Sequence, residues 1–154
     1  ARENVPDLLS CYESRLTLEP SAAVFAAERH DPQALAQIRD ALEHRRDATN
    51  PQVHREDADF QFHLAIAIAA EDSYFSTAMA ALKDHITVGM RFHGVSVKRE
   101  ASGLSRVFDE HFAIFESIRQ RHVQQAHDLM HAHLSESRDR LSEKKEPAQA
   151  MNAG

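Results

Sequence analysis

Four residues that can ligate a transition metal lie on the apolar faces of three expected helices. Asp59 and His63 are four residues apart, so a helix places both side chains on one face. His111 lies in the middle of the apolar stripe of a later helix, and His133 lies in the middle of the next one. Three imidazoles and one carboxylate that face one buried point suit a divalent transition metal.

The two later histidines are expected at the same height. They lie equally far from a turn near His122, so an antiparallel hairpin would bring them level. Burying such polar groups without partners is costly, and a metal ion would remove that cost. We therefore predict a metal site at Asp59, His63, His111 and His133. The alternative is that each histidine is a hydrogen-bonded residue of the core.

Arg15 is a second unusual residue, because it lies in the middle of the apolar face of the first helix. Arginine is rarely buried without a partner, and its planar fork binds a carboxylate well. An inward Arg15 beside a metal would suit a small anionic ligand. A local ion pair with Glu19, four residues on, is the alternative. Further candidates for the ligand site are His85, Arg91 and His93.

The elements that must position these residues are helices throughout the chain. Apolar residues recur at i, i+3, i+4 and i+7, and Gly and Pro are few, at 4 and 5. Pro20 either kinks the first helix or opens a new one. The expected fold is all-α, an antiparallel bundle of six or seven helices around a central metal or ligand cavity. The helices are expected from near Asp7, then over about 32–46, 56–70, 73–93, 104–121 and 123–144.

One domain accounts for the length. The 154 residues suit a single domain over 1–145, with a flexible tail over 146–154. Apolar residues surround the helix over 56–70, so we expect it at the centre of the bundle. The formal net charge of −6 argues against a nucleic-acid surface within this chain. Cys11 is the one cysteine, which excludes an intrachain disulfide and fits a cytoplasmic location. No apolar run approaches the ~20 residues of a membrane span.

The chain resembles the C-terminal effector-binding domain (FCD) of FadR-type regulators in the GntR superfamily, over about Leu8 to Leu134. The resemblance rests on short motifs with characteristic spacing: Arg15-Leu-Thr-Leu-Glu19-Pro20, Asp59-Phe-Gln-Phe-His63, Glu110-His111 and His133-Leu134. Two positions depart from the family pattern. Asp72 replaces a usual Asn, and Arg121-His122 replaces a usual Gly-Asp between the last two helices, which questions the geometry of that turn.

The resemblance implies a function as well as a fold. It assigns the metal to Asp59, His63, His111 and His133, and effector contact to Arg15. The metal would be a divalent transition ion, with Zn first and Ni, Mn or Fe as alternatives. The implied effectors are small organic-acid or sugar-acid carboxylates, and the implied assembly is a homodimer.

The implied protein is a transcriptional regulator and not an enzyme. DNA would be bound only through an N-terminal winged-helix domain that is absent from this chain. Two other functions remain open at this point. One is a metal-dependent enzyme on a helical bundle, and the other is a structural oligomerisation domain.

Overall fold

The computed structural model describes residues 5–47, 52–98 and 103–145, with side chains described over 6–44, 56–91 and 106–142. These residues form helices and no strand, which confirms the all-α prediction. The seven helices found in this part of the chain are α1 (Val5–Arg29), α2 (Pro32–Asp47), α3 (Gln52–Ala69), α4 (Ser73–Ala81), α5 (Lys83–Lys98), α6 (Gly103–Arg119) and α7 (Val123–Lys145). None of the described helices is long and apolar enough to cross a membrane.

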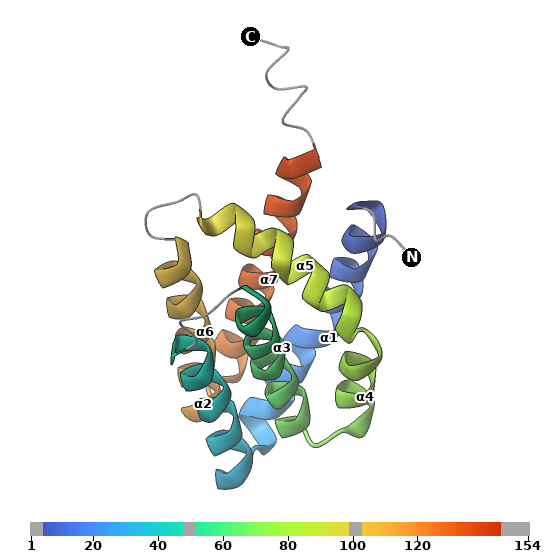
Figure 1. Cartoon of the computed structure of the whole chain (residues 1–154). Coiled ribbons are helices and arrows are strands. Elements are labelled where there is room, and N and C mark those ends of the chain that lie inside the picture. Colours follow the sequence, from blue (N-terminus) through green and yellow to red (C-terminus); the bar gives the residue numbers. More distant parts are fainter. Residues whose placement is uncertain (1–4, 48–51, 99–102, 146–154) are drawn as a thin grey trace.

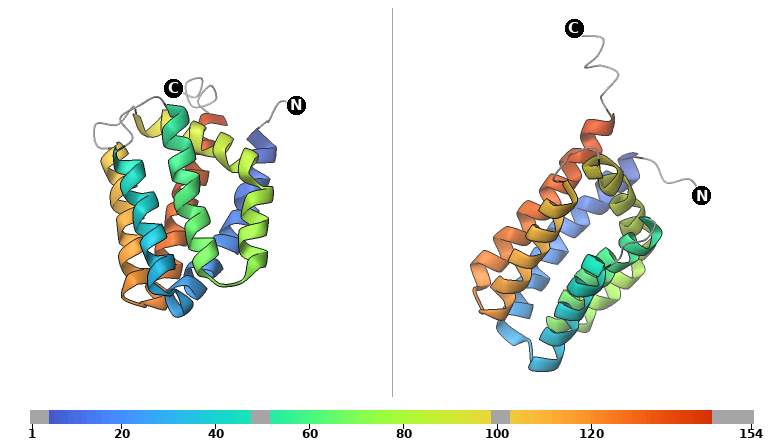
Figure 2. Two further views of the ribbon diagram at one scale, coloured as in Figure 1. Left: turned by 60° about the horizontal axis from the view of Figure 1, so that its bottom comes forward. Right: turned by 60° about the vertical axis from the view of Figure 1, so that its left-hand side comes forward.

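The helices form two facing layers with one helix across an end. Figure 2 shows α6, α7 and α1 side by side in one layer and α2, α3 and α4 in the other. Helix α1 packs along α7 and α3, and α2 packs on α3 and α6. Helix α5 crosses the end of the bundle and contacts α3 and α7 (Figure 1). This arrangement brings α3, α6 and α7 together around one interior point.

Two expected boundaries differ from the structure. The single helix expected over 73–93 is two helices, because the chain turns at Leu82. The Leu82 amide still donates to the carbonyls of Ala78 and Met79, so the turn keeps its backbone bonded. No Gly or Pro marks this break, which explains why the sequence pattern runs through it. The connection expected over 94–103 is also shorter, since α5 continues to Lys98.

Pro20 lies inside α1 and does not divide it. The first helix therefore carries Arg15 and Glu19 on one continuous element.

Helix caps follow the sequence signals. The Asp31 carboxylate accepts a hydrogen bond from the Ala34 amide at 2.7 Å, and the Asp72 carboxylate accepts one from the Tyr74 amide at 3.0 Å. Asp72 thus caps α4 in place of the usual Asn.

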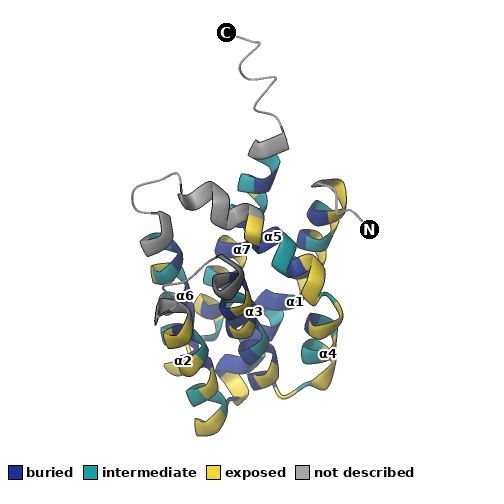
Figure 3. Cartoon of the chain, in the orientation of Figure 1, coloured by how far each residue is buried: buried dark blue, intermediate teal, exposed yellow. Residues whose placement is uncertain are grey.

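The core lies between the two layers, where the buried faces of the helices meet (Figure 3). A larger cluster joins α1, α2, α3, α6 and α7, and a smaller one joins α3 to α4 and α5. Helix α3 contributes to both clusters, as expected of a central helix. Its apolar circumference is not wholly buried, however, because Ile68 is 47% exposed.

The turn between α6 and α7 holds the end of α1. Arg121 adopts a left-handed backbone with φ of 60°, a conformation that favours glycine. Its guanidinium donates to the carbonyls of Ala27, Glu28 and His30 at 3.0–3.1 Å. Those are terminal carbonyls that α1 itself cannot satisfy. The replacement of Gly by Arg therefore keeps the turn and adds a cap for α1.

Candidate metal centre

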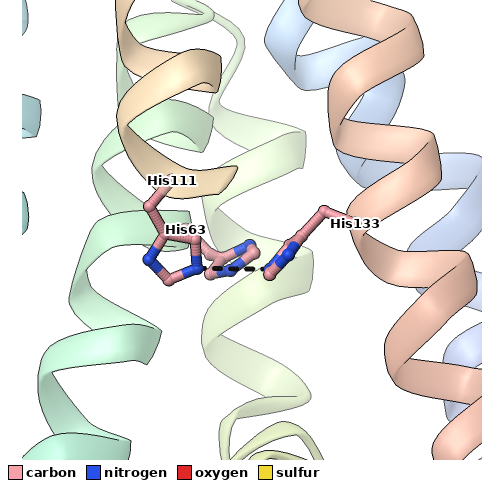
Figure 4. Close-up of side chains that lie close together, drawn as sticks. All are labelled: His63, His111 and His133. Atoms are coloured by element: carbon pink, nitrogen blue, oxygen red, sulfur yellow. Dashed lines mark hydrogen bonds between the residues drawn. The ribbon is translucent and has the colours of Figure 1, made fainter. Parts of the chain in front are cut away.

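Three buried histidines meet in the interior from three helices. His63 projects from α3, His111 from α6 and His133 from α7 (Figure 4). Their residues are 2%, 1% and 7% exposed. Each offers a ring nitrogen, and these ligand atoms all lie within 4.8 Å of one another. The structure thus brings together the three histidines that the sequence analysis selected.

The spacing of the ring nitrogens fits a metal ion. Nε2 of His111 lies 3.2 Å from Nε2 of His133. In a tetrahedral shell with Zn–N bonds of about 2.0–2.1 Å, two nitrogens lie about 3.3–3.4 Å apart. The ring of Phe62 stacks on His111 with centroids 4.6 Å apart, which fixes the plane of that imidazole. The equal heights predicted for His111 and His133 are therefore confirmed.

Glu19 holds His63 from the side of its Nδ1 atom. Oε1 of Glu19 lies 2.5 Å from Nδ1 of His63, and Oε2 lies 2.5 Å from Nε of Arg15. All three residues are buried. Burial disfavours the carboxylate, but the Arg15 guanidinium and the hydrogen bonds from His63 and Arg15 outweigh it and lower the pKa of Glu19 from 4.5 to about 2. Glu19 is therefore ionised and accepts the proton of Nδ1, which leaves Nε2 of His63 with a lone pair.

His63 itself favours the neutral state that a metal ligand needs. Burial lowers the pKa of His63, and this outweighs the raising effect of the Glu19 carboxylate. An imidazole held by a carboxylate on one nitrogen and open at the other is the usual arrangement of metal-ligating histidine.

Glu110 holds His133 from the side of its Nδ1 atom, as Glu19 holds His63. Oε1 of Glu110 lies 2.6 Å from Nδ1 of His133, so α6 supports a ligand carried by α7. Arg106 lies one turn before Glu110, with its Nε 3.9 Å from Oε2. The contact between Glu110 and His133 was missed from the sequence because Glu110 is about 100° from His111 on its own helix. Its partner is on the neighbouring helix, and a wheel drawn for one helix does not show that.

Asp59 lies beside one of the three histidines, His111. Its Oδ1 atom is 4.0 Å from Nδ1 of His111, and its side chain is 16% exposed. The carboxylate is thus near Nδ1 of His111, whereas Nε2 of the same ring faces His133. Its predicted role as a fourth ligand stays a prediction.

The residues predicted to contact the effector lie in different surroundings. Arg15 is buried and pairs with Glu19, which confirms the local ion pair weighed from the sequence. Its guanidinium also lies over the ring of Tyr12, 5.1 Å from the centroid. Arg91 pairs with the buried Glu56, joining α5 to α3 at 3.2 Å. His85 is exposed, and the side chain of His93 lies outside the described residues.

A second buried polar contact joins α1 to α7 near this site. The hydroxyl of Tyr12 lies 2.6 Å from the hydroxyl of Ser137. Gly89 of α5 faces the same ring, and a Cβ at that position would lie 3.3 Å from Tyr12. Ser137 is one helical turn after His133, so this contact helps to set the position of α7 beside α1.

A surface groove of about 720 Å³ lies between α1 and α4, away from the histidine cluster. Its lining is mainly apolar and includes Leu18, Phe25, Phe75 and Leu82. None of the four predicted metal ligands lines it. The central cavity expected from the sequence therefore stays a prediction.

The comparisons with known proteins identify the family of the chain. A family model described as the FCD domain matches residues 10–136. The chain is 30% identical over 142 residues to the HTH-type transcriptional regulator LutR of Bacillus subtilis (strain 168), which covers 92% of this chain and 64% of LutR. The chain thus spans less than two thirds of that relative.

Two solved structures share the fold. One is a Streptococcus agalactiae GntR, with a TM-score of 0.70 and 22% identity over 90% of this chain and 61% of that chain. The other is a GntR family member from Pseudomonas syringae pv. tomato str. DC3000, with a TM-score of 0.74 and 17% identity over 99% and 62%. The family match and the similarity to LutR lead to one conclusion: the chain belongs to the FCD domain family of GntR-type transcriptional regulators.

Proposed function

We propose that this chain is the ligand-sensing domain of a bacterial transcriptional regulator, and that it senses a small carboxylate at a bound metal. The observation that carries the proposal is the meeting of His63, His111 and His133, whose ligand atoms lie within 4.8 Å of one another. Carboxylates on two of these rings supply the support that metal ligands need.

The residues present fit a divalent transition metal. His63, His111 and His133 would hold it through ring nitrogens, and Asp59 would be the fourth protein ligand after its side chain turns from Nδ1 of His111 towards the clustered nitrogens. The metal would act as a Lewis acid that attracts one end of an anionic ligand. Imidazole with carboxylate suits Zn first, and Ni, Mn and Fe as alternatives.

The effector in this proposal is an organic acid or sugar acid. Arg15 donates to Glu19 through Nε, and in this proposal its two Nη groups would bind the carboxylate of the effector. Arg91 is the more accessible cation, since its side chain is 56% exposed while its partner Glu56 is buried. His85 and His93 are the other candidates of the proposal, on the same helix.

The domain would act through a dimer. Binding of the acid would favour one packing of the helices, and a homodimer would pass that preference to DNA-binding domains N-terminal to this chain. LutR is named as an HTH-type regulator, and this chain corresponds to 64% of its length. In this role the domain would bind its ligand without converting it, and it would act in the cytoplasm.

Binding of acids to metal-loaded and metal-stripped protein tests the proposal. Calorimetric titration with hydroxy acids, sugar acids and dicarboxylates should identify an acid that binds the metal-loaded protein. The neutral amide analogue of that acid should not bind. Removal of the metal should abolish that binding. Equal binding of acid and amide, or equal binding without metal, would contradict the proposal. Turnover of the bound acid would instead favour a metal-dependent enzyme.

A control separates direct contact from general electrostatics. Arg91→Ala removes a cation near the effector candidates, whereas Arg119→Ala removes one from an exposed pair with Glu116. The first change should weaken acid binding and the second should leave it unchanged. Arg15→Lys tests the buried cation while keeping a charge beside Glu19.

A further inference from the structure

A second pair of histidines lies on the outer face of α7. His127 and His131 are four residues apart, so their side chains lie one above the other on the helix. Their rings are nearly parallel, at 15°, with centroids 6.2 Å apart. Both are accessible, since His131 is exposed and the side chain of His127 is 38% exposed. This pair is separate from buried His133, although it shares the same helix.

The same nitrogen of each ring is engaged by a neighbouring side chain. Nδ1 of His127 donates to the Asp128 carboxylate at 2.9 Å, and Nδ1 of His131 lies 3.4 Å from the hydroxyl of Ser135. The carboxylate of Asp128 requires the proton of His127 on Nδ1, whereas the hydroxyl of Ser135 can donate to or accept from Nδ1 of His131. The lone pair of His127 is then on Nε2, and His131 offers the same atom in its Nδ1-protonated tautomer; Nε2 is the usual ligand atom when Nδ1 is held in this way.

Asp128 adds negative charge beside both rings. Hydrogen bonds from His127 and Gln124 lower the pKa of Asp128, and the nearby His131 acts in the same direction. The contact with Gln124 is 2.9 Å long, so this carboxylate is itself held in place. A held carboxylate behind an imidazole raises its basicity as a metal ligand.

We propose that His127 and His131 form a second, surface site for a divalent transition metal, with Asp128 orienting His127. Two Zn–N bonds of about 2.0–2.1 Å require the two nitrogens to lie within about 4.2 Å of each other. The rings reach this separation by rotation of their side-chain torsions, which exposed residues undergo within nanoseconds. Water completes the coordination shell. Imidazole pairs bind Cu²⁺ most strongly, and Ni²⁺ and Zn²⁺ less so.

Counting bound zinc tests this proposal directly. Equilibrium dialysis against excess Zn²⁺, followed by elemental analysis, should give two ions per chain for the wild type. The variant His127→Gln/His131→Gln should bind one ion fewer. His122→Gln is the matched control, because His122 is also exposed, directly before α7, but has no histidine four residues away. It should bind as many ions as the wild type.

The outcomes separate this site from the central one. One ion in the wild type and none in the double variant would support the surface site and contradict the central site. The same number of ions in the wild type and the double variant would overturn the surface site, whatever the central site does. A further variant tests the orienting carboxylate: Asp128→Asn should weaken the surface affinity for Zn²⁺ about tenfold.

Discussion

Glu19 lies between Arg15 and His63, with each carboxylate oxygen 2.5 Å from one of them. The carboxylate links the first helix to the proposed metal ligand of α3, and all three side chains are buried. This relationship explains why a charged pair occurs on the apolar face of α1. Arg15 keeps Glu19 ionised, and Glu19 keeps Nε2 of His63 available.

Replacing Glu19 should therefore weaken metal binding without touching a ligand. Glu19→Gln removes the carboxylate that orients His63, and losses of such support lower metal affinity about 10–100-fold. Competition with a chromogenic chelator measures this affinity. Glu116→Gln is the matched control, because Glu116 lies on α6 and pairs locally with Arg119. If both variants keep wild-type affinity, Glu19 does not support a metal ligand.

The same change should lower stability in a pH-dependent way. Glu19→Gln leaves the Arg15 guanidinium buried without its counter-charge, which costs about 3–5 kcal/mol. The pKa of Glu19 is lowered in the folded state from 4.5 to about 2, so its stabilising effect is complete above pH 4.5 and is lost as the pH falls towards 2. Urea unfolding of metal-free protein should show the two proteins converging over that range. A gap independent of pH would contradict this.

Glu110 should matter for His133 as Glu19 does for His63. Glu110→Gln keeps a hydrogen-bonding group near Nδ1 but removes the charge, so metal affinity should again fall by about 10–100-fold. Asp109→Asn is a suitable control, since Asp109 is the exposed neighbour on the same helix. A larger effect from the control than from Glu110→Gln would place the support of His133 elsewhere.

The Tyr12–Ser137 contact should behave as one buried hydrogen bond. Tyr12→Phe and Ser137→Ala each leave the other hydroxyl buried without this partner, at a cost of about 1–3 kcal/mol. The double variant should cost less than the sum of the two, because it leaves neither hydroxyl behind. Denaturant unfolding of all four proteins gives the coupling. Simple additivity would show that the two hydroxyls act independently.

Arg121 allows a test of the α6–α7 turn. Arg121→Ala removes three hydrogen bonds to the end of α1 and keeps a left-handed residue, so it should destabilise by about 1–3 kcal/mol. Arg121→Gly loses the same bonds but relieves the backbone, and should be about 1 kcal/mol more stable than the Ala variant. Thermal unfolding decides the order. An Ala variant as stable as the wild type would show that Arg121 does not stabilise the end of α1.

Much of this site could be predicted from the sequence because its ligands lie on amphipathic helices. An i,i+4 spacing fixes the relative places of Asp59 and His63, and equal distances from one turn place His111 level with His133. The helix break at Leu82 could not be predicted, since no Gly or Pro marks it. Glu110 was missed for a different reason. Its contact with His133 depends on how α6 packs against α7, and that is a property of the assembled bundle.

Elemental analysis of the protein carrying His127→Gln/His131→Gln tests the central claim most directly, because that background removes the proposed surface site. Purified protein loaded with Zn²⁺ and dialysed against metal-free buffer should retain about one ion per chain. Adding His133→Ala should abolish that retention, since His133 supplies one of the clustered ring nitrogens. No retained ion in the background variant, after loading with Zn²⁺, Ni²⁺ or Mn²⁺, would contradict a metal-dependent sensor and leave the three histidines as a polar core.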